Sequence, residues 1–251
     1  MNNEGQYLVL MSNSDVRGNK QAEFVTHLSH KLRLGPQCMV SLVEASIPAS
    51  WLTIPKDAKV HINKTDGSSI SLSLSPGYYA DAASVINALN ITCLAYGVAI
   101  TYDPIRNKIG VHHSTDDAAS IFFDSKSCKM LGTINADFVN LSGVPKFASG
   151  ELDLSCSVDG GIHVYLDIIE SQLVGDSSSP LLRSIPVPHI NAVGTRMSFE
   201  FAHRHYVYCS VSEVDTVSVV LRNSFGDIID FCFGSVVLKL HFRAARNPLF
   251  S

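Results

Sequence analysis

Ten histidines are the first residues to test for chemistry, because imidazole ligates metals and transfers protons near neutral pH. His203 and His205 flank Arg204, and residues two apart lie on the same face of a strand. No third ligand follows at a recognisable spacing, so the pair predicts a polar loop at a sheet end. His112 and His113 are adjacent, so on a strand they point to opposite faces and do not share a metal.

Catalytic nucleophiles and phosphate-binding loops have recognisable local settings, and the chain shows none. There is no Gly-x-Ser-x-Gly elbow and no Cys-x-x-Cys pair. Asp116 and Asp117 are adjacent carboxylates, but the serine and threonine before them indicate a solvated turn. Gly160 and Gly161 precede an expected strand, whereas a phosphate cradle needs a helix N-terminus. We therefore expect no enzyme, no catalytic residue, no small-molecule substrate, and no bound cofactor or metal.

The charge balance argues against a dedicated nucleic-acid-binding protein. The chain has 19 Lys and Arg residues against 23 Asp and Glu residues, for a net charge of −4. Arg243 and Arg246 near the C-terminus form a cluster too small for a nucleic-acid footprint. Contact with nucleic acid is therefore expected to be non-specific at most.

Charged residues are few for a folded domain. They make up 17 % of the 251 residues, where about 25 % is typical. Apolar runs such as Val236–Leu238 are far shorter than the roughly 18 residues of a membrane helix. The first six residues lack the features of a signal peptide. We therefore expect an intracellular chain without a membrane span, with much of its surface covered by protein partners.

The six cysteines are consistent with an intracellular chain. Several lie within apolar strand patterns, as Cys232 does between Phe231 and Phe233. Without a secretory signal, they are predicted to be buried, reduced thiols.

Alternation of apolar and polar residues indicates strands along most of the chain. The clearest alternating segments are Ile70–Leu74, Ile162–Ile168, Met197–Phe201 and Val236–Phe242, and further candidates are residues 7–11, 24–34, 39–45, 60–63, 98–102, 108–112 and 216–221. The even-numbered residues of Val164–Ile168 and Val236–Phe242 are expected to face a core. Many short antiparallel strands predict an all-β sandwich or barrel. A jelly roll is favoured over an immunoglobulin fold, because Trp51 lies outside a Cys…Trp…Cys frame.

Helical signals are confined to the middle of the chain. Asp81 is placed to cap a helix whose apolar stripe consists of Val85, Ile86, Leu89 and Cys93. A second short helix is predicted from Asp124 to Gly132, and a hairpin lies between the two. The sequence therefore predicts a single jelly roll built from residues 1–75 and 142–251, with a small α+β subdomain inserted at residues 76–141.

A series of motifs runs through the chain in a fixed order. They are Leu10–Ser14, Phe24–Leu28, Val40–Pro48, Trp51, Pro76–Tyr79, Tyr102–Asp103, Met130–Gly132, Val164–Asp176, Pro180–Arg183, Ile185–Val187, Gly234 and Leu238–Arg243. Together they resemble the penton, or minor capsid, proteins of Polinton/Maverick elements and of related adintovirus-like and virophage-like viruses. Ser177–Ser179 depart from the family pattern and are expected to form a plain polar linker.

The resemblance implies a structural capsid protein of the virion. Such a subunit is expected to form a homopentamer at icosahedral vertices, beside a major capsid protein with a double jelly roll. The low charge agrees with this, because the cores of interfaces are depleted in charge. Val237 and Val220 are apolar at nominally outward strand positions, so both are candidates for a buried flank of the subunit.

A carbohydrate-binding or cupin-like jelly roll is the alternative. A lectin presents loop aromatics beside acidic residues, and Tyr78 and Tyr79 near Asp81 are the candidates, although they are interpreted as anchors of the inserted subdomain. A cupin needs a clustered His/Glu metal set, which the sequence does not show.

Overall fold

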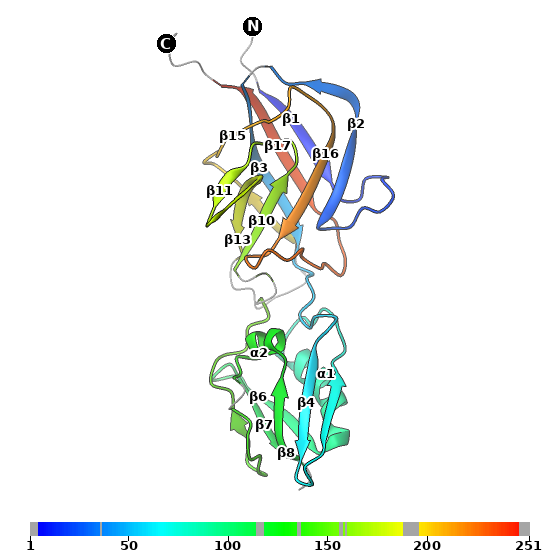
Figure 1. Cartoon of the computed structure of the whole chain (residues 1–251), viewed down its shortest axis with the longest axis vertical. Coiled ribbons are helices and arrows are strands. Elements are labelled where there is room, and N and C mark those ends of the chain that lie inside the picture. Colours follow the sequence, from blue (N-terminus) through cyan, green and yellow to red (C-terminus); the bar gives the residue numbers. More distant parts are fainter. Residues whose placement is uncertain are drawn as a thin grey trace. The chain divides into compact units, whose positions relative to one another are not determined.

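A computed structural model describes residues 5–35, 37–113, 118–134, 137–155, 158, 160–187 and 196–245. The chain divides into two compact units (Figure 1). The first unit contains Met1–Trp51, Val158–Pro188 and Gly194–Ser251, and the second contains Leu52–Ser157.

The first unit is a sandwich of two antiparallel sheets. The first sheet has the order β1 (Gln6–Met11), β17 (Val237–Ala244), β3 (Cys38–Pro48) and β14 (Arg196–Glu200), and β15 (Val207–Tyr208) also pairs with β3. The second sheet has the order β13 (Leu181–Pro186), β10 (Gly161–Leu166), β16 (Glu213–Arg222) and β2 (Glu23–Arg33). Without the short β15, the eight strands of the two sheets, lettered B to I in chain order, read B-I-D-G and F-E-H-C, which is the jelly-roll arrangement. The predicted all-β jelly roll is confirmed.

The inward rows of the sandwich strands form its core. In β10, Ile162, Val164 and Leu166 are buried, while His163 and Tyr165 between them are partly exposed. In β17 and just before it, the buried apolar residues are Val236, Leu238, Leu240 and Phe242. The predicted register is therefore confirmed in both strands, each of which is central in its sheet.

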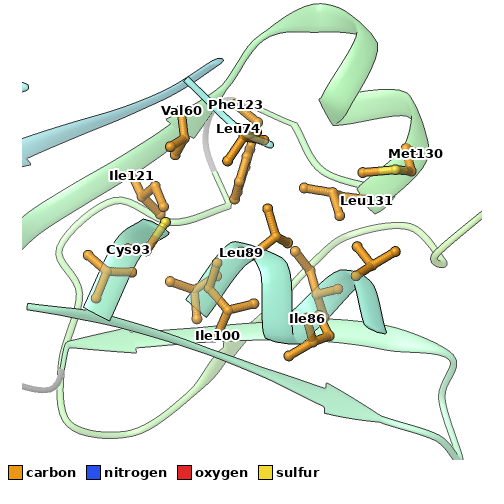
Figure 2. Close-up of a cluster of buried hydrophobic side chains, with 14 of the residues drawn as sticks. Val60, Leu74, Ile86, Leu89, Cys93, Ile100, Ile121, Phe123, Met130 and Leu131 are labelled. Carbon is orange, nitrogen blue, oxygen red and sulfur yellow. The ribbon is translucent and has the colours of Figure 1, made fainter. Parts of the chain in front are cut away.

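The second unit carries all of the helices found in the described residues. One sheet has the order β5 (Ser69–Ser73), β4 (Lys59–Lys64) and β8 (Ala118–Phe123), and another has β6 (Val98–Asp103), β7 (Lys108–His113) and β9 (Lys146–Phe147). The helices are α1 (Ala82–Cys93), the short 3-10 turn η1 (Leu94–Tyr96) and α2 (Ser125–Leu131). Their apolar side chains meet in one cluster, where Leu89 and Cys93 of α1 lie among residues of β4, β8 and α2 (Figure 2).

Helix α1 begins and ends where its local sequence dictates. The Asp81 side chain accepts a hydrogen bond from the Ser84 backbone N–H at 2.7 Å, which satisfies a free donor of the first turn. The predicted stripe is the buried one. After η1, Gly97 adopts φ 78°, a left-handed conformation that ends the helical path at little cost for glycine.

The second unit is longer than the predicted insertion at residues 76–141. Its strands β4 and β5 were expected to belong to the jelly roll, but β4 pairs with β8, for example Ile62 with Ile121. On the other side, β9 pairs with β7 and lies beyond residue 141. The insertion therefore runs from about Leu52 to Ser157, because its sheets close through pairings between distant segments.

Two local predictions are wrong. Ser177–Ser179 form β12, which pairs with β11 (Gln172–Val174) across a two-residue turn in which Gly175 has φ 62°. Cys232 is exposed, because the apolar pattern around it is not a strand: Phe231 is turned inward and bridges to Trp51.

Candidate interaction surface

The predicted histidine pair lies in a loop. His203 and His205 are exposed in the connection between β14 and β15. Across the described ranges, no group of three or more His, Cys, Asp or Glu residues is placed to hold a metal. Asp116, Asp117 and Arg246 lie outside the described residues.

The other candidate residues belong to the second unit. His112 and His113 end β7, where they pair with Ala99 and Val98. The Tyr79 ring packs on the apolar cluster, its hydroxyl donates to the Ser75 carbonyl at 3.0 Å, and its backbone N–H donates to the Thr53 hydroxyl. Tyr79 therefore fits its interpretation as an anchor of the inserted unit.

The outer face of the first sheet carries an apolar row where a solvated sheet would be polar. Tyr7, Val9 and Met11 of β1 point outward and are 53 %, 49 % and 46 % exposed. Val237 of β17 lies beside them, directly opposite Met11. We call these four residues the β1 strip. Contiguous apolar side chains on an outer face indicate a surface that a partner covers.

The backbone of β1 adds to this. In the described part of the chain β1 pairs only with β17, so its other edge pairs with no strand, and of that edge the Met11 carbonyl accepts a turn hydrogen bond from the Ser14 N–H at 3.2 Å. Proteins blunt such edges with charges, proline or bulges. None of these interrupts Gln6–Met11, whose pairing with β17 is regular throughout. The β1 edge therefore has the features of an interface.

A cationic and aromatic cluster, which we call the His241 cluster, borders the strip. It contains Tyr7, Arg204, Tyr206, His241 and Arg243. The Tyr7 and His241 ring centroids are 4.7 Å apart, and the Tyr206 hydroxyl is 2.8 Å from His241 Nδ1. Arg243 lies over the Tyr206 ring at 3.6 Å, and an Arg204 nitrogen is 3.4 Å from the Tyr7 hydroxyl. Ring stacking therefore holds Arg243, and a hydrogen bond holds Arg204, so that two exposed cations lie on this face.

His241 itself is buried, although its position in β17 points outward. Burial lowers the pKa of His241 below its ordinary value, and the neighbouring Arg204 and Arg243 lower that pKa further. These causes favour the neutral imidazole, and its Nδ1 lies opposite the Tyr206 hydroxyl.

The outer face of the second sheet is more polar. His163 contacts the Ser184 hydroxyl at 2.8 Å and the Ser224 hydroxyl at 3.3 Å. Val220, the second interface candidate, is partly exposed and lies between Tyr165 and Glu23. Val237 and Val220 therefore mark opposite outer faces of the sandwich.

Sequence reasoning found Val237 but missed Tyr7, Val9 and Met11. The signal was present, because Tyr7–Met11 is apolar at every position rather than at alternate ones. A strand that is apolar on both rows is covered on both faces.

Of the comparisons with known proteins, the one with solved structures supports the fold. No family model matches the chain, and no curated protein matches it. Among solved structures, the crystal structure of the mavirus penton protein is similar, with a TM-score of 0.57 and 12 % sequence identity. The match covers 96 % of this chain and 100 % of that chain, so the likeness extends over both units. Within the described ranges, no helix is long and apolar enough to cross a membrane.

Proposed function

We propose that this chain is a structural capsid protein of the penton type. It forms a homopentamer at the vertices of an icosahedral virion, beside a major capsid protein. The observation that carries the proposal is the β1 strip, an apolar outer row on an open edge strand. The likeness in fold to a penton protein over the whole chain supports it.

A closed ring requires two different complementary flanks on every subunit. The β1 strip supplies one flank. The outer face of the second sheet, around Val220, is our candidate for the other. Each contact should bury more than about 1,000 Å² in total, which is the lower range for specific interfaces. Interface cores of this kind exclude charge, in agreement with the charge content of 17 %.

The carbohydrate-binding alternative has less support. Of its two candidates, Tyr78 and Tyr79, Tyr79 uses its ring within the apolar cluster and its hydroxyl on the Ser75 carbonyl. A sugar platform needs an aromatic face presented to solvent, so Tyr79 is committed to the fold instead.

A pair of matched substitutions tests the proposal. Val237→Asp places a carboxylate within the β1 strip, and Val144→Asp makes the same change at a 71 % exposed position of the second unit. We expect Val237→Asp to weaken ring formation at least about 100-fold, because an unpaired charge is costly in an interface core. Val144→Asp should assemble as the unaltered chain does, and both variants should keep the same circular dichroism. Equal assembly by both variants would contradict a role for the strip.

A further inference from the structure

Two thiols lie opposite each other on paired strands of the first sheet. Cys38 is the first residue of β3, and Cys209 follows β15 directly. Tyr208 pairs with Met39, so the next residue, Cys209, falls opposite Cys38. The Cys209 backbone N–H donates to the Cys38 carbonyl at 2.9 Å, and the Cys209 thiol hydrogen-bonds to the Cys38 sulfur.

We propose that Cys38 and Cys209 form an oxidation-sensitive clasp, a cross-strand disulfide that joins β15 to β3. Directly opposed residues of antiparallel strands have Cα atoms about 4.5–5.5 Å apart. A disulfide spans about 4.4–6.8 Å between Cα atoms, so the bond forms with little movement of the backbone. The other described cysteines do not share this placement: Cys93 and Cys128 belong to the second unit, and Cys232 is exposed in a connection.

The oxidant is a small disulfide such as oxidised glutathione. Cys209 is only partly buried and reacts first: its thiolate attacks one glutathione sulfur, forms a mixed disulfide and releases one glutathione. The Cys38 thiolate then attacks the Cys209 sulfur and releases the second glutathione. The protein loses two protons and two electrons as one oxidised glutathione becomes two reduced molecules.

Burial makes this closure slow at neutral pH. It raises the pKa of Cys209 to about 12 and raises the pKa of the Cys38 thiol as well. The thiolate is the nucleophile, and its fraction increases with pH. At any pH below the pKa of the thiol, the rate of disulfide formation should therefore rise about tenfold for each unit of increase in pH. In a reducing cell the clasp stays open, and in an oxidising medium it closes. Formation of this disulfide in virus particles that have left the cell rests on the proposed function. Its formation in the isolated chain does not.

The clasp should stabilise the fold measurably. It closes a loop from residue 38 to residue 209 that contains the whole second unit. Closing so long a loop restricts the unfolded chain, and we expect the melting temperature to rise by about 10 °C.

The test oxidises the folded full-length chain with oxidised glutathione at pH 7 and at pH 8.5, followed by alkylation and peptide mapping. We expect a peptide pair linked through Cys38 and Cys209, faster formation at the higher pH, and a melting temperature that returns to its starting value after reduction. Cys209→Ser should abolish the link and the shift. The matched control Cys232→Ser changes an exposed cysteine and should retain both.

Two results would overturn the proposal. One is that Cys38 and Cys209 are still free thiols, and are completely alkylated, under conditions in which oxidised glutathione has fully oxidised the exposed Cys232. The other is a linked pair that forms only in denaturant or leaves the melting temperature unchanged. Both results are measured on the isolated chain, so they do not depend on whether the chain forms rings. If either result is obtained, the disulfide proposal fails and the penton proposal is unaffected.

Discussion

The two outer faces of the sandwich differ, although both sheets are built by the same alternation. In β10 of the second sheet, the outward residues His163 and Tyr165 each carry a polar group, and the exposed Asp167 follows the strand directly. In β1 of the first sheet, the outward residues Tyr7, Val9 and Met11 are an aromatic and two aliphatic side chains. The inward rows are apolar in both sheets, so they form the common core of the fold. The outward rows differ, because one face is suited to solvent and the other to contact with a protein partner.

The two histidines on these faces illustrate the same difference. His163 is partly exposed and contacts the Ser184 hydroxyl on its own sheet and the Ser224 hydroxyl in the turn after β16. His241 is buried beneath Tyr7 and Tyr206, and it faces Arg204 and Arg243. The first sheet therefore extends its packing outward beyond the sandwich core.

The largest expected effect is a loss of stability on truncating a core leucine, and it should be similar in the two sheets. Leu240→Ala in β17 and Leu166→Ala in β10 each remove a buried side chain from an inner row. Each should cost about 2–5 kcal/mol in the free energy of unfolding, because a cavity remains. Urea denaturation of each variant measures the loss. A cost below about 1 kcal/mol at either position would mean that the inner rows are not equivalent.

A smaller effect, a dependence of the free energy of unfolding on pH, is expected from His241 on the first sheet. The pKa of His241 is lower in the folded chain than its ordinary value of 6.5, so the unfolded chain binds the proton more readily. The contribution of neutral His241 to stability is present above about pH 6.5 and is lost as the pH falls below it.

Thermal unfolding between pH 7.5 and pH 5 measures this contribution, with His241→Gln as the control. The unaltered chain should lose more stability on acidification than the control does. Parallel curves for the two proteins would show that the His241 cluster does not hold the imidazole neutral.

The smallest effect is expected at the charged pair beside the β1 strip. Lys239 contacts Glu44, and both side chains are partly exposed. Exposed pairs contribute little, so Glu44→Gln should shift the melting temperature of the isolated subunit by less than about 2 °C. Calorimetry at low salt gives the shift, and a drop of 5 °C or more would assign this face a role in folding as well as in assembly.

Local chemistry made parts of the fold predictable. The α1 cap at Asp81 and the inward rows of β10 and β17 follow from residue spacing, and the structure confirms them. The boundary of the inserted unit does not follow, because it depends on β4 pairing with β8 about sixty residues later. Strand β8 was also missed, since Ala118–Phe123 shows no alternation.

The candidate surface was predictable only in part. Val237 stands out as an apolar residue in an outward position of a clear strand. Tyr7, Val9 and Met11 are hidden in a continuous apolar run, which does not reveal which row faces inward. Pairing with β17 assigns Leu10 to the core and the other row to the surface.

The mass of the purified chain in solution tests the central claim most directly. The subunit has a mass of 27.2 kDa, and light scattering at micromolar concentration, with negative-stain imaging, measures the assembly. The penton proposal predicts a species of five subunit masses with a ring-shaped outline, either alone or once the major capsid protein is added. A chain that stays at one subunit mass under both conditions, and is absent from the vertices of assembled particles, would contradict it.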